Sequence, residues 1–120
     1  MAYTSFEDLD VWKRACRLAV NIYSVLADCR DLGMKGQMTR AAVSIASNIA
    51  EGAERNSLKE FARFLHISKG SAAELRTQIY IASQIGLISD EDRRSLVGEL
   101  VQISKMLHSL IRSHSSEKVS

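Results

Sequence analysis

Positively charged side chains form the clearest chemical pattern in this sequence. They recur in two predicted helices, one near the N-terminus and one in the middle of the chain: Lys13, Arg14 and Arg17, then Arg63, Lys69 and Arg76. Such groups can bind the phosphate backbone of a nucleic acid, since each neutralised phosphate releases counterions. A solvated helix face is the commoner origin of a single patch, and Glu60 and Glu74 interrupt the second group. No aromatic residue is interleaved with these cations, so the pattern does not indicate base stacking.

The three histidines, His66, His108 and His114, do not form a metal-binding pattern. A di-iron bundle needs Glu-x-x-His on two helices, whereas the residue three positions before each of these histidines is Arg, Lys or Ile. The sequence also lacks HExxH, GxGxxG, GxSxG and the Gly-Lys-Ser/Thr phosphate loop. We therefore predict no catalytic residue, no metal, no cofactor and no enzymatic activity. An enzyme whose site forms only in the folded chain is the alternative.

Polar side chains also occur among small apolar residues near the centre of the chain. Asn48 and Glu51 are expected to hydrogen bond at the end of a helix or to specify how the helices pair. A contact with a ligand or a partner is the alternative for both. Arg55, in the loop that follows, is expected to pair with Glu51 or Glu54.

Residues 37–75 carry the strongest structural signal, two helices joined by a short turn. Gly52 is expected to end the first helix in a left-handed conformation. Ser57 is expected to begin the second helix as its N-cap, with Glu60 completing a capping box. A connection as short as residues 52–56 makes the two helices antiparallel neighbours.

Apolar residues recur every three or four positions in four segments, which predicts an all-α protein. The predicted helices span residues 6–28, 37–51 and 58–85, and a fourth begins at Ser89. Gly33 and Gly36 are expected to break the helical structure within a loop over residues 29–36, and Gly86 is expected to end the third helix. Gly70, inside the third helix, is expected to mark a close helix crossing. Together these features predict an antiparallel up-down-up-down four-helix bundle.

The first predicted helix has two neighbouring apolar stripes. The stripe expected to face the core is Leu9, Trp12, Cys16, Ala19, Tyr23 and Leu26, and beside it lie Val11, Ala15, Leu18, Ile22 and Val25. Two stripes make an apolar face wider than one packing partner needs. We therefore expect identical copies to associate as a ring, which would repeat each basic group around an axis.

Composition is consistent with a single domain spanning residues 1–120, with a core over 6–112 and a polar, frayed tail over 113–120. The chain has no proline. Its net charge of +2 is smaller than the charge that a dedicated nucleic-acid binder usually carries.

Cys16 and Cys29 are expected to be free thiols. No secretory signal pattern or membrane-spanning apolar run is present, so we expect a cytoplasmic protein that does not bind membranes.

Several short motifs together resemble the bacterial four helix bundle protein family, whose members are encoded in intervening sequences of large-subunit ribosomal RNA genes. The resemblance covers residues 6–86 and rests on Phe6–Leu9, Val11-Trp12, Gln37, Arg40–Ile45, Asn48–Gly52, Arg55, Ser57, Glu60-Phe61, Phe64-Leu65, Gly70-Ser71 and Glu74-Leu75. The accessory variability determinant of diversity-generating retroelements is similar in fold. Two features depart from the family: Ala46 stands where many members have proline, and the first loop lacks a proline-containing segment.

The resemblance implies a homopentamer without known catalysis. The retroelement relatives bind nucleic acid and a reverse transcriptase through basic surfaces, and RNA binding is suspected for the intervening-sequence proteins. The leading hypothesis is thus a non-catalytic homo-oligomer that binds RNA or DNA backbone through the six cations named above. The competing hypothesis is an adaptor or scaffold that holds a protein partner, such as a polymerase, without touching nucleic acid.

Overall fold

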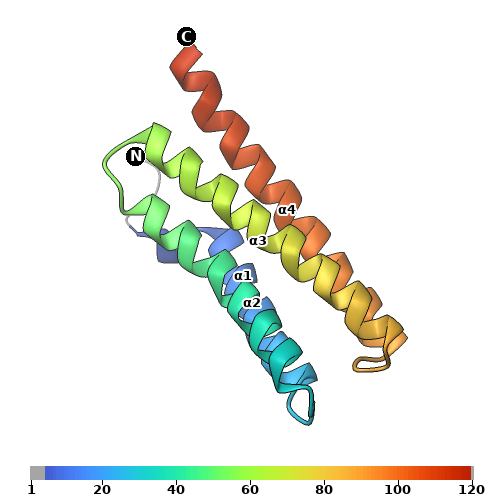
Figure 1. The fold of residues 1–120 in the computed structure, drawn as a ribbon. Helices are drawn as coiled ribbons and strands as arrows, with labels where there is room; N and C mark the ends of the chain where they lie inside the picture. The colour runs from blue at the N-terminus through green and yellow to red at the C-terminus, as the bar shows by residue number, and fades with distance from the viewer. Residues whose placement is uncertain (1–4, 120) are drawn as a thin grey trace.

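The computed structural model describes the backbone of residues 5–119 and the side chains of residues 5–114. A short 3-10 helix, η1 (Phe6–Asp8), precedes four α-helices: α1 (Asp10–Val25), α2 (Leu32–Ala53), α3 (Leu58–Gln84) and α4 (Asp90–Val119). Successive helices run in opposite directions, so the up-down-up-down four-helix bundle is confirmed over the described chain (Figure 1). The bundle is elongated, with principal extents of 49 × 21 × 20 Å.

Each helix packs against its neighbours in the chain, and α1 also packs against α4 to close the bundle. The α2–α3 pair shares the most extensive contact and the α1–α4 pair the least. Consequently α1 and α3 occupy opposite corners, and α4 lies between them on one side of the bundle. This arrangement decides which of the predicted cations can act together.

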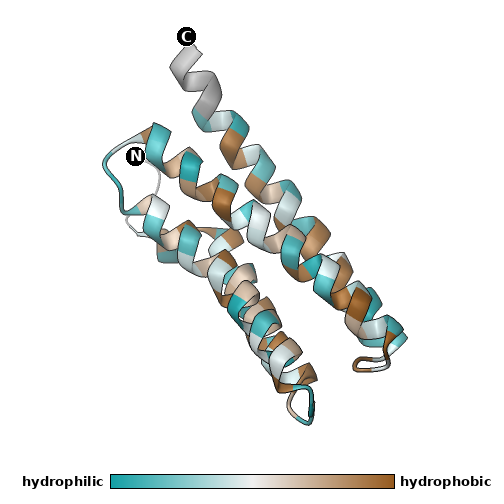
Figure 2. Cartoon of the chain, in the orientation of Figure 1, coloured by the Kyte–Doolittle hydropathy of each residue, from teal (hydrophilic) through white to brown (hydrophobic). Residues whose placement is uncertain are grey.

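The core is built from apolar stripes on all four helices (Figure 2). On α1 the buried residues are Val11, Ala15, Leu18 and Ile22, followed by Leu26 just after the helix. The expectation for α1 was therefore wrong, because the neighbouring stripe faces the core. Trp12, Cys16 and Ala19 are only partly buried, and Tyr23 is exposed. Sequence spacing identifies both stripes, but the packing of α2 and α4 decides which one is covered.

Both ends of α1 and the start of α2 differ from the sequence-based expectation. The predicted helix 6–28 is divided at Leu9, whose backbone is extended (φ −75°, ψ 123°), and α1 ends at Val25. Helix α2 begins at Leu32, so Gly33 and Gly36 lie within it and the predicted loop 29–36 is wrong. The Asp31 carboxylate accepts a hydrogen bond from the Met34 amide at 3.0 Å and caps the helix. This cap offsets part of the helix-propensity cost of the glycines, about 1 kcal/mol each.

The glycines of the central hairpin also have different roles from those expected. Gly52 is helical and buried, and a Cβ placed there would lie 2.6 Å from the Cβ of Phe64. It therefore permits the close approach of α2 and α3 instead of ending α2, which continues to Ala53. Gly70 has open space around its Cα, so no helix crosses there. Gly86 alone among the described residues has a positive φ, 81°, and it ends α3 as predicted.

Serine hydroxyls cap the starts of α3 and α4. Ser57 Oγ accepts from the Glu60 amide at 3.0 Å, which confirms the predicted N-cap. The reciprocal half of the capping box is absent from the described contacts, because the Glu60 carboxylate pairs with Arg63. Ser89 Oγ accepts from the Asp92 amide at the start of α4. Helix α4 is helical as far as Val119, and the side chains of the predicted polar tail beyond His114 lie outside the described residues.

Candidate nucleic-acid interface

Four of the six predicted cations lie in two separate grooves, one on each side of α4. Arg14 and Arg17 of α1 face α4 in the first, which we call the α1–α4 groove. Lys69 and Arg76 of α3 face α4 in the second, the α3–α4 groove. Since α1 and α3 occupy opposite corners, the two groups do not merge into one patch within a single chain. Lys13 is exposed on α1 outside both grooves.

A carboxylate neutralises part of the α1–α4 groove. The Arg14 guanidinium donates from Nε and Nη2 to the two carboxylate oxygens of Glu99, both at 2.8 Å. This hydrogen bonding holds the pKa of Glu99 below its usual value, although partial desolvation opposes the shift, and the charges of Arg14 and Arg17 add to it. Such a bidentate pair is the strongest geometry available to arginine and a carboxylate. The predicted contact residue Arg14 is therefore already paired.

The α3–α4 groove has no such carboxylate. It has two adjoining parts of about 450 and 440 Å³, and its described walls consist of Lys69, Ala73, Arg76, Thr77 and Tyr80 from α3 and Val101, Ser104, Lys105, His108 and Ser109 from α4. Lys69, Arg76 and Lys105 bring three cations to it. None of these cations makes a salt bridge within residues 5–114.

Helical spacing explains how these residues come together. Lys69, Arg76 and Tyr80 are separated by whole turns of α3 and share the side of that helix next to its buried stripe. Lys105 and His108 lie on the matching side of α4, beside buried Leu107. The small side chains between them leave the space between the helices open. The groove therefore follows from the register of two amphipathic helices.

Lys105 and His108 were not among the predicted contact residues. Lys69 Nζ lies 3.3 Å from His108 Nδ1. Because an ammonium group can only donate, Lys69 is the donor and His108 Nδ1 the acceptor in a hydrogen bond between these atoms. The spacing of residues within α4 does not show how that helix lines up against α3. The sequence alone therefore could not identify Lys105 and His108 as residues of the groove.

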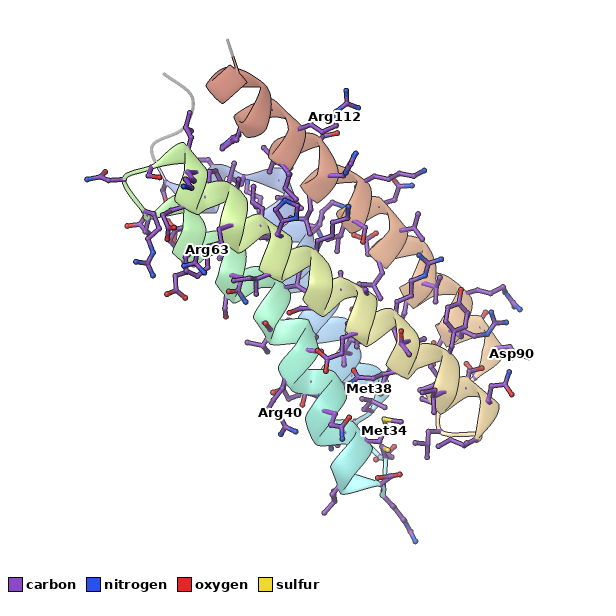
Figure 3. The ribbon with its side chains drawn as sticks, turned by 45° about the horizontal axis from the view of Figure 1, so that its top comes forward. Met34, Met38, Arg40, Arg63, Asp90 and Arg112 are labelled. Carbon is purple, nitrogen blue, oxygen red and sulfur yellow. The ribbon has the colours of Figure 1, made fainter. Side chains whose placement is uncertain are left out.

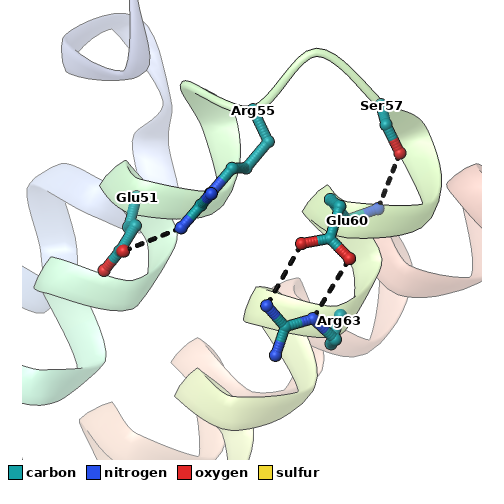
Figure 4. Close-up of polar contacts among 5 residues, drawn as sticks. All are labelled: Glu51, Arg55, Ser57, Glu60 and Arg63. Atoms are coloured by element: carbon teal, nitrogen blue, oxygen red, sulfur yellow. Dashed lines mark hydrogen bonds and ion pairs between the residues drawn. The ribbon is translucent and has the colours of Figure 1, made fainter.

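Arg63 belongs to a third location, the turn between α2 and α3 (Figure 4). Its Nε and Nη2 donate to Glu60 at 3.2 and 3.1 Å, and the pKa of Glu60 is lowered chiefly by this hydrogen bond. The Arg55–Glu51 pair expected from the sequence is present at 3.0 Å. Both guanidinium carbons lie over the Phe64 ring, 4.6 Å from its centroid for Arg63 and 4.8 Å for Arg55. These contacts give Arg63 and Arg55 structural partners.

Asn48 hydrogen bonds to Ser44, one turn earlier in α2. Its Nδ2 donates to the backbone oxygen and to the hydroxyl of Ser44, both at 2.9 Å. The Ser44 hydroxyl in turn lies 2.9 Å from the hydroxyl of Ser71 on α3. Nearby, Ser68 Oγ is fully buried and donates to the backbone oxygen of Ile45 at 2.6 Å. A polar network of this kind fixes how α2 and α3 pair.

Comparison with known proteins agrees with the resemblance seen in the sequence. The family model described as 23S rRNA-intervening sequence protein matches residues 7–109. The chain belongs to this family. A crystal structure from Bacteroides thetaiotaomicron, described as a protein with unknown function from the S23 ribosomal protein family, shares 25% identity. It superposes with a TM-score of 0.80 over 84% of this chain and 97% of that one. No curated protein gave a significant match.

This member of the intervening-sequence protein family has no cluster of three or more metal-binding side chains in the part that the structure describes. Cys16 and Cys29 are free and partly buried, and desolvation raises the pKa of Cys16. No described helix is long and apolar enough to cross a membrane.

Exposed arginines outside the two grooves, such as Arg40 on α2 and Arg112 on α4, project from separate places on the bundle (Figure 3).

Proposed function

We propose that this protein is a non-catalytic homo-oligomer that binds the backbone of RNA or DNA, with the α3–α4 groove as its principal contact surface. The observation that carries the proposal is the convergence of Lys69, Arg76 and Lys105 on one groove whose described walls contain no carboxylate. Cations in a concave surface without a neighbouring carboxylate create a local positive potential even where the net charge is small. A nucleic-acid backbone is the polyanion that best complements a row of such charges.

The six cations predicted from the sequence contribute unequally under this proposal. Lys69 and Arg76 contact phosphates in the α3–α4 groove, together with Lys105. Lys13 and Arg17 provide a weaker second surface on the other side of α4. Arg14 and Arg63 contribute least, because Glu99 and Glu60 already neutralise them.

Self-association is supported by large apolar side chains that remain exposed in the single chain. On α1, Val20 is 67% exposed and Tyr23 is 53% exposed, and on α2, Leu32 is 74% exposed. Figure 2 shows hydrophobic residues recurring along every helix. Exposed apolar surface favours contact with another protein surface, including a second copy. A ring would repeat the α3–α4 groove around an axis, and the family resemblance implies five copies.

The same exposed side chains also support the second candidate, an adaptor that holds a protein partner without contacting nucleic acid. Nucleic-acid binding requires the cations of the α3–α4 groove, whereas the adaptor function does not. An adaptor that docks through α1 and α2 would keep its partner when Arg76 is changed, whereas a nucleic-acid binder would lose affinity.

Two measurements test the proposal. Multi-angle light scattering at micromolar concentration is expected to give the mass of an oligomer, and a monomer would refute the oligomeric part. Fluorescence anisotropy with a labelled structured RNA is expected to show binding by the native protein and weaker binding by Arg76→Gln. Arg40→Gln, which removes an exposed arginine from α2, is the matched control and should bind like the native protein. Equal binding by all three would refute the role of the groove.

A further inference from the structure

Tyr80 places an aromatic ring in the basic groove. It lies one helical turn after Arg76, lines the α3–α4 groove with Lys69 and Arg76, and is 41% exposed. The sequence suggested that no aromatic residue accompanies the cations. The folded chain corrects this, because a separation of four residues on a helix puts two side chains on the same face.

The electrostatic character of the α3–α4 surface changes at Tyr80. Toward Lys69 the groove is lined by cations and small polar residues. Toward the α3–α4 turn, Tyr80 borders a different hollow that contains the carboxylate of Asp90, which lies 3.8 Å from Arg93 and accepts from Ser83. A chain of phosphates would therefore be attracted along the groove as far as Tyr80, whereas beyond it Asp90 offsets the charge of Arg93.

We propose that the α3–α4 groove binds single-stranded nucleic acid, with phosphates along Lys69, Arg76 and Lys105 and one unpaired base stacked on the ring of Tyr80. This inference rests on the proposed function and specifies its ligand. In a duplex each base is already stacked between its neighbours, so an exposed aromatic ring gains a partner only from a single strand, loop or end. Sequence-tolerant binding of single strands combines a positively charged groove with aromatic stacking in this way.

The dimensions of the groove agree with a short single strand. Lys69 and Tyr80 are eleven residues apart on α3, which corresponds to about 16 Å along the helix axis. That length accommodates a few nucleotides. The ligand class is therefore a short unpaired segment of RNA or DNA, bound mainly through its backbone and fixed at one end by a stacked base.

The test uses the full chain and a single-stranded oligonucleotide of mixed sequence that contains 2-aminopurine, whose fluorescence falls when the base stacks. Native protein and Tyr80→Phe, which keeps the ring, are expected to bind equally and to quench the probe. Tyr80→Leu, which keeps apolar bulk but has no ring, is expected to lose quenching and at least about five-fold in affinity. The same oligonucleotide annealed to its complement should bind with no dependence on residue 80. Circular dichroism melting of each variant checks that the fold is intact.

Arg76→Gln, measured in parallel, separates this inference from the proposed function. If Arg76→Gln weakens binding and Tyr80→Leu does not, the stacking role of Tyr80 is overturned while backbone binding stands. If no single strand or duplex binds to the native protein, both are overturned. Tighter binding of the duplex than of the single strand would also overturn the inference.

Discussion

The two grooves that flank α4 have similar cations and different surroundings. The α1–α4 groove, of about 550 Å³, contains Arg14 and Arg17, but Glu99 holds Arg14 in a bidentate pair. The α3–α4 groove contains Lys69, Arg76 and Lys105, and its described walls include no carboxylate. The difference shows that the number of cations on a helix does not by itself decide where positive potential is available to a ligand. The position of the nearest carboxylate matters more.

The Glu99–Arg14 pair has a structural explanation. Helices α1 and α4 share the least extensive contact of the four neighbouring pairs. An ion pair that joins the two helices at this position helps to hold them together. We therefore interpret the α1–α4 groove as a structural contact and keep the α3–α4 groove as the proposed binding surface.

The largest expected effect separates the two grooves by charge reversal. Changing Lys69 and Arg76 together to Glu should weaken nucleic-acid affinity by more than about ten-fold at moderate salt, because contacts with phosphates are replaced by repulsion. Changing Lys13 and Arg17 together to Glu alters the net charge by the same amount and should have a clearly smaller effect. Anisotropy titrations of both variants measure this. Equal losses would mean that net charge matters and the grooves do not.

A carboxylate introduced into the α3–α4 groove should make it resemble the α1–α4 groove. Ser104 lines both parts of the α3–α4 groove, and Ser95 lines the other groove. Ser104→Glu is expected to reduce affinity several-fold, since the new charge competes with phosphates for Arg76 and Lys105. Ser95→Glu adds the same charge beside Glu99 and should change affinity little. An unchanged affinity in Ser104→Glu, again by anisotropy, would count against the groove.

A smaller effect concerns stability and pH. Because Arg14 lowers the pKa of Glu99 in the folded protein, this pair stabilises the fold above the unfolded glutamate pKa of about 4.3, and the contribution is lost as pH falls through the lower folded value. Native protein should therefore melt a few degrees above Glu99→Gln at pH 7, with the difference shrinking toward pH 3. Thermal melts by circular dichroism at both pH values test this. A difference of the same size at both pH values would show that Glu99 acts through packing and not through its charge.

The sequence was sufficient to predict the class of the fold and several of its local features. The presence of four helices, the Ser57 cap and the Gly86 stop depend on residues close together in the chain, and each was predicted correctly. Gly52 was misassigned because its role depends on Phe64 across the hairpin. The spacing of apolar residues on α1 could not tell which of two stripes the other helices would cover.

The candidate site was predicted only in part, for the same reason. Lys69 and Arg76 were identified because their spacing on one helix is visible in the sequence. Glu99 follows Arg14 by 85 residues, and Lys105 comes from a different helix than Arg76. No local pattern links these pairs. Their relation appears only when the register of α4 against both neighbouring helices is known.

The dependence of RNA affinity on salt tests the central claim most directly. The logarithm of the association constant for a single-stranded probe should fall linearly with the logarithm of the salt concentration, and Arg76→Gln should reduce the slope by about 0.7, the value for one lost phosphate contact. Arg40→Gln should leave the slope unchanged. A slope that is the same in the native protein and in Arg76→Gln would contradict the assignment of the α3–α4 groove as the nucleic-acid interface.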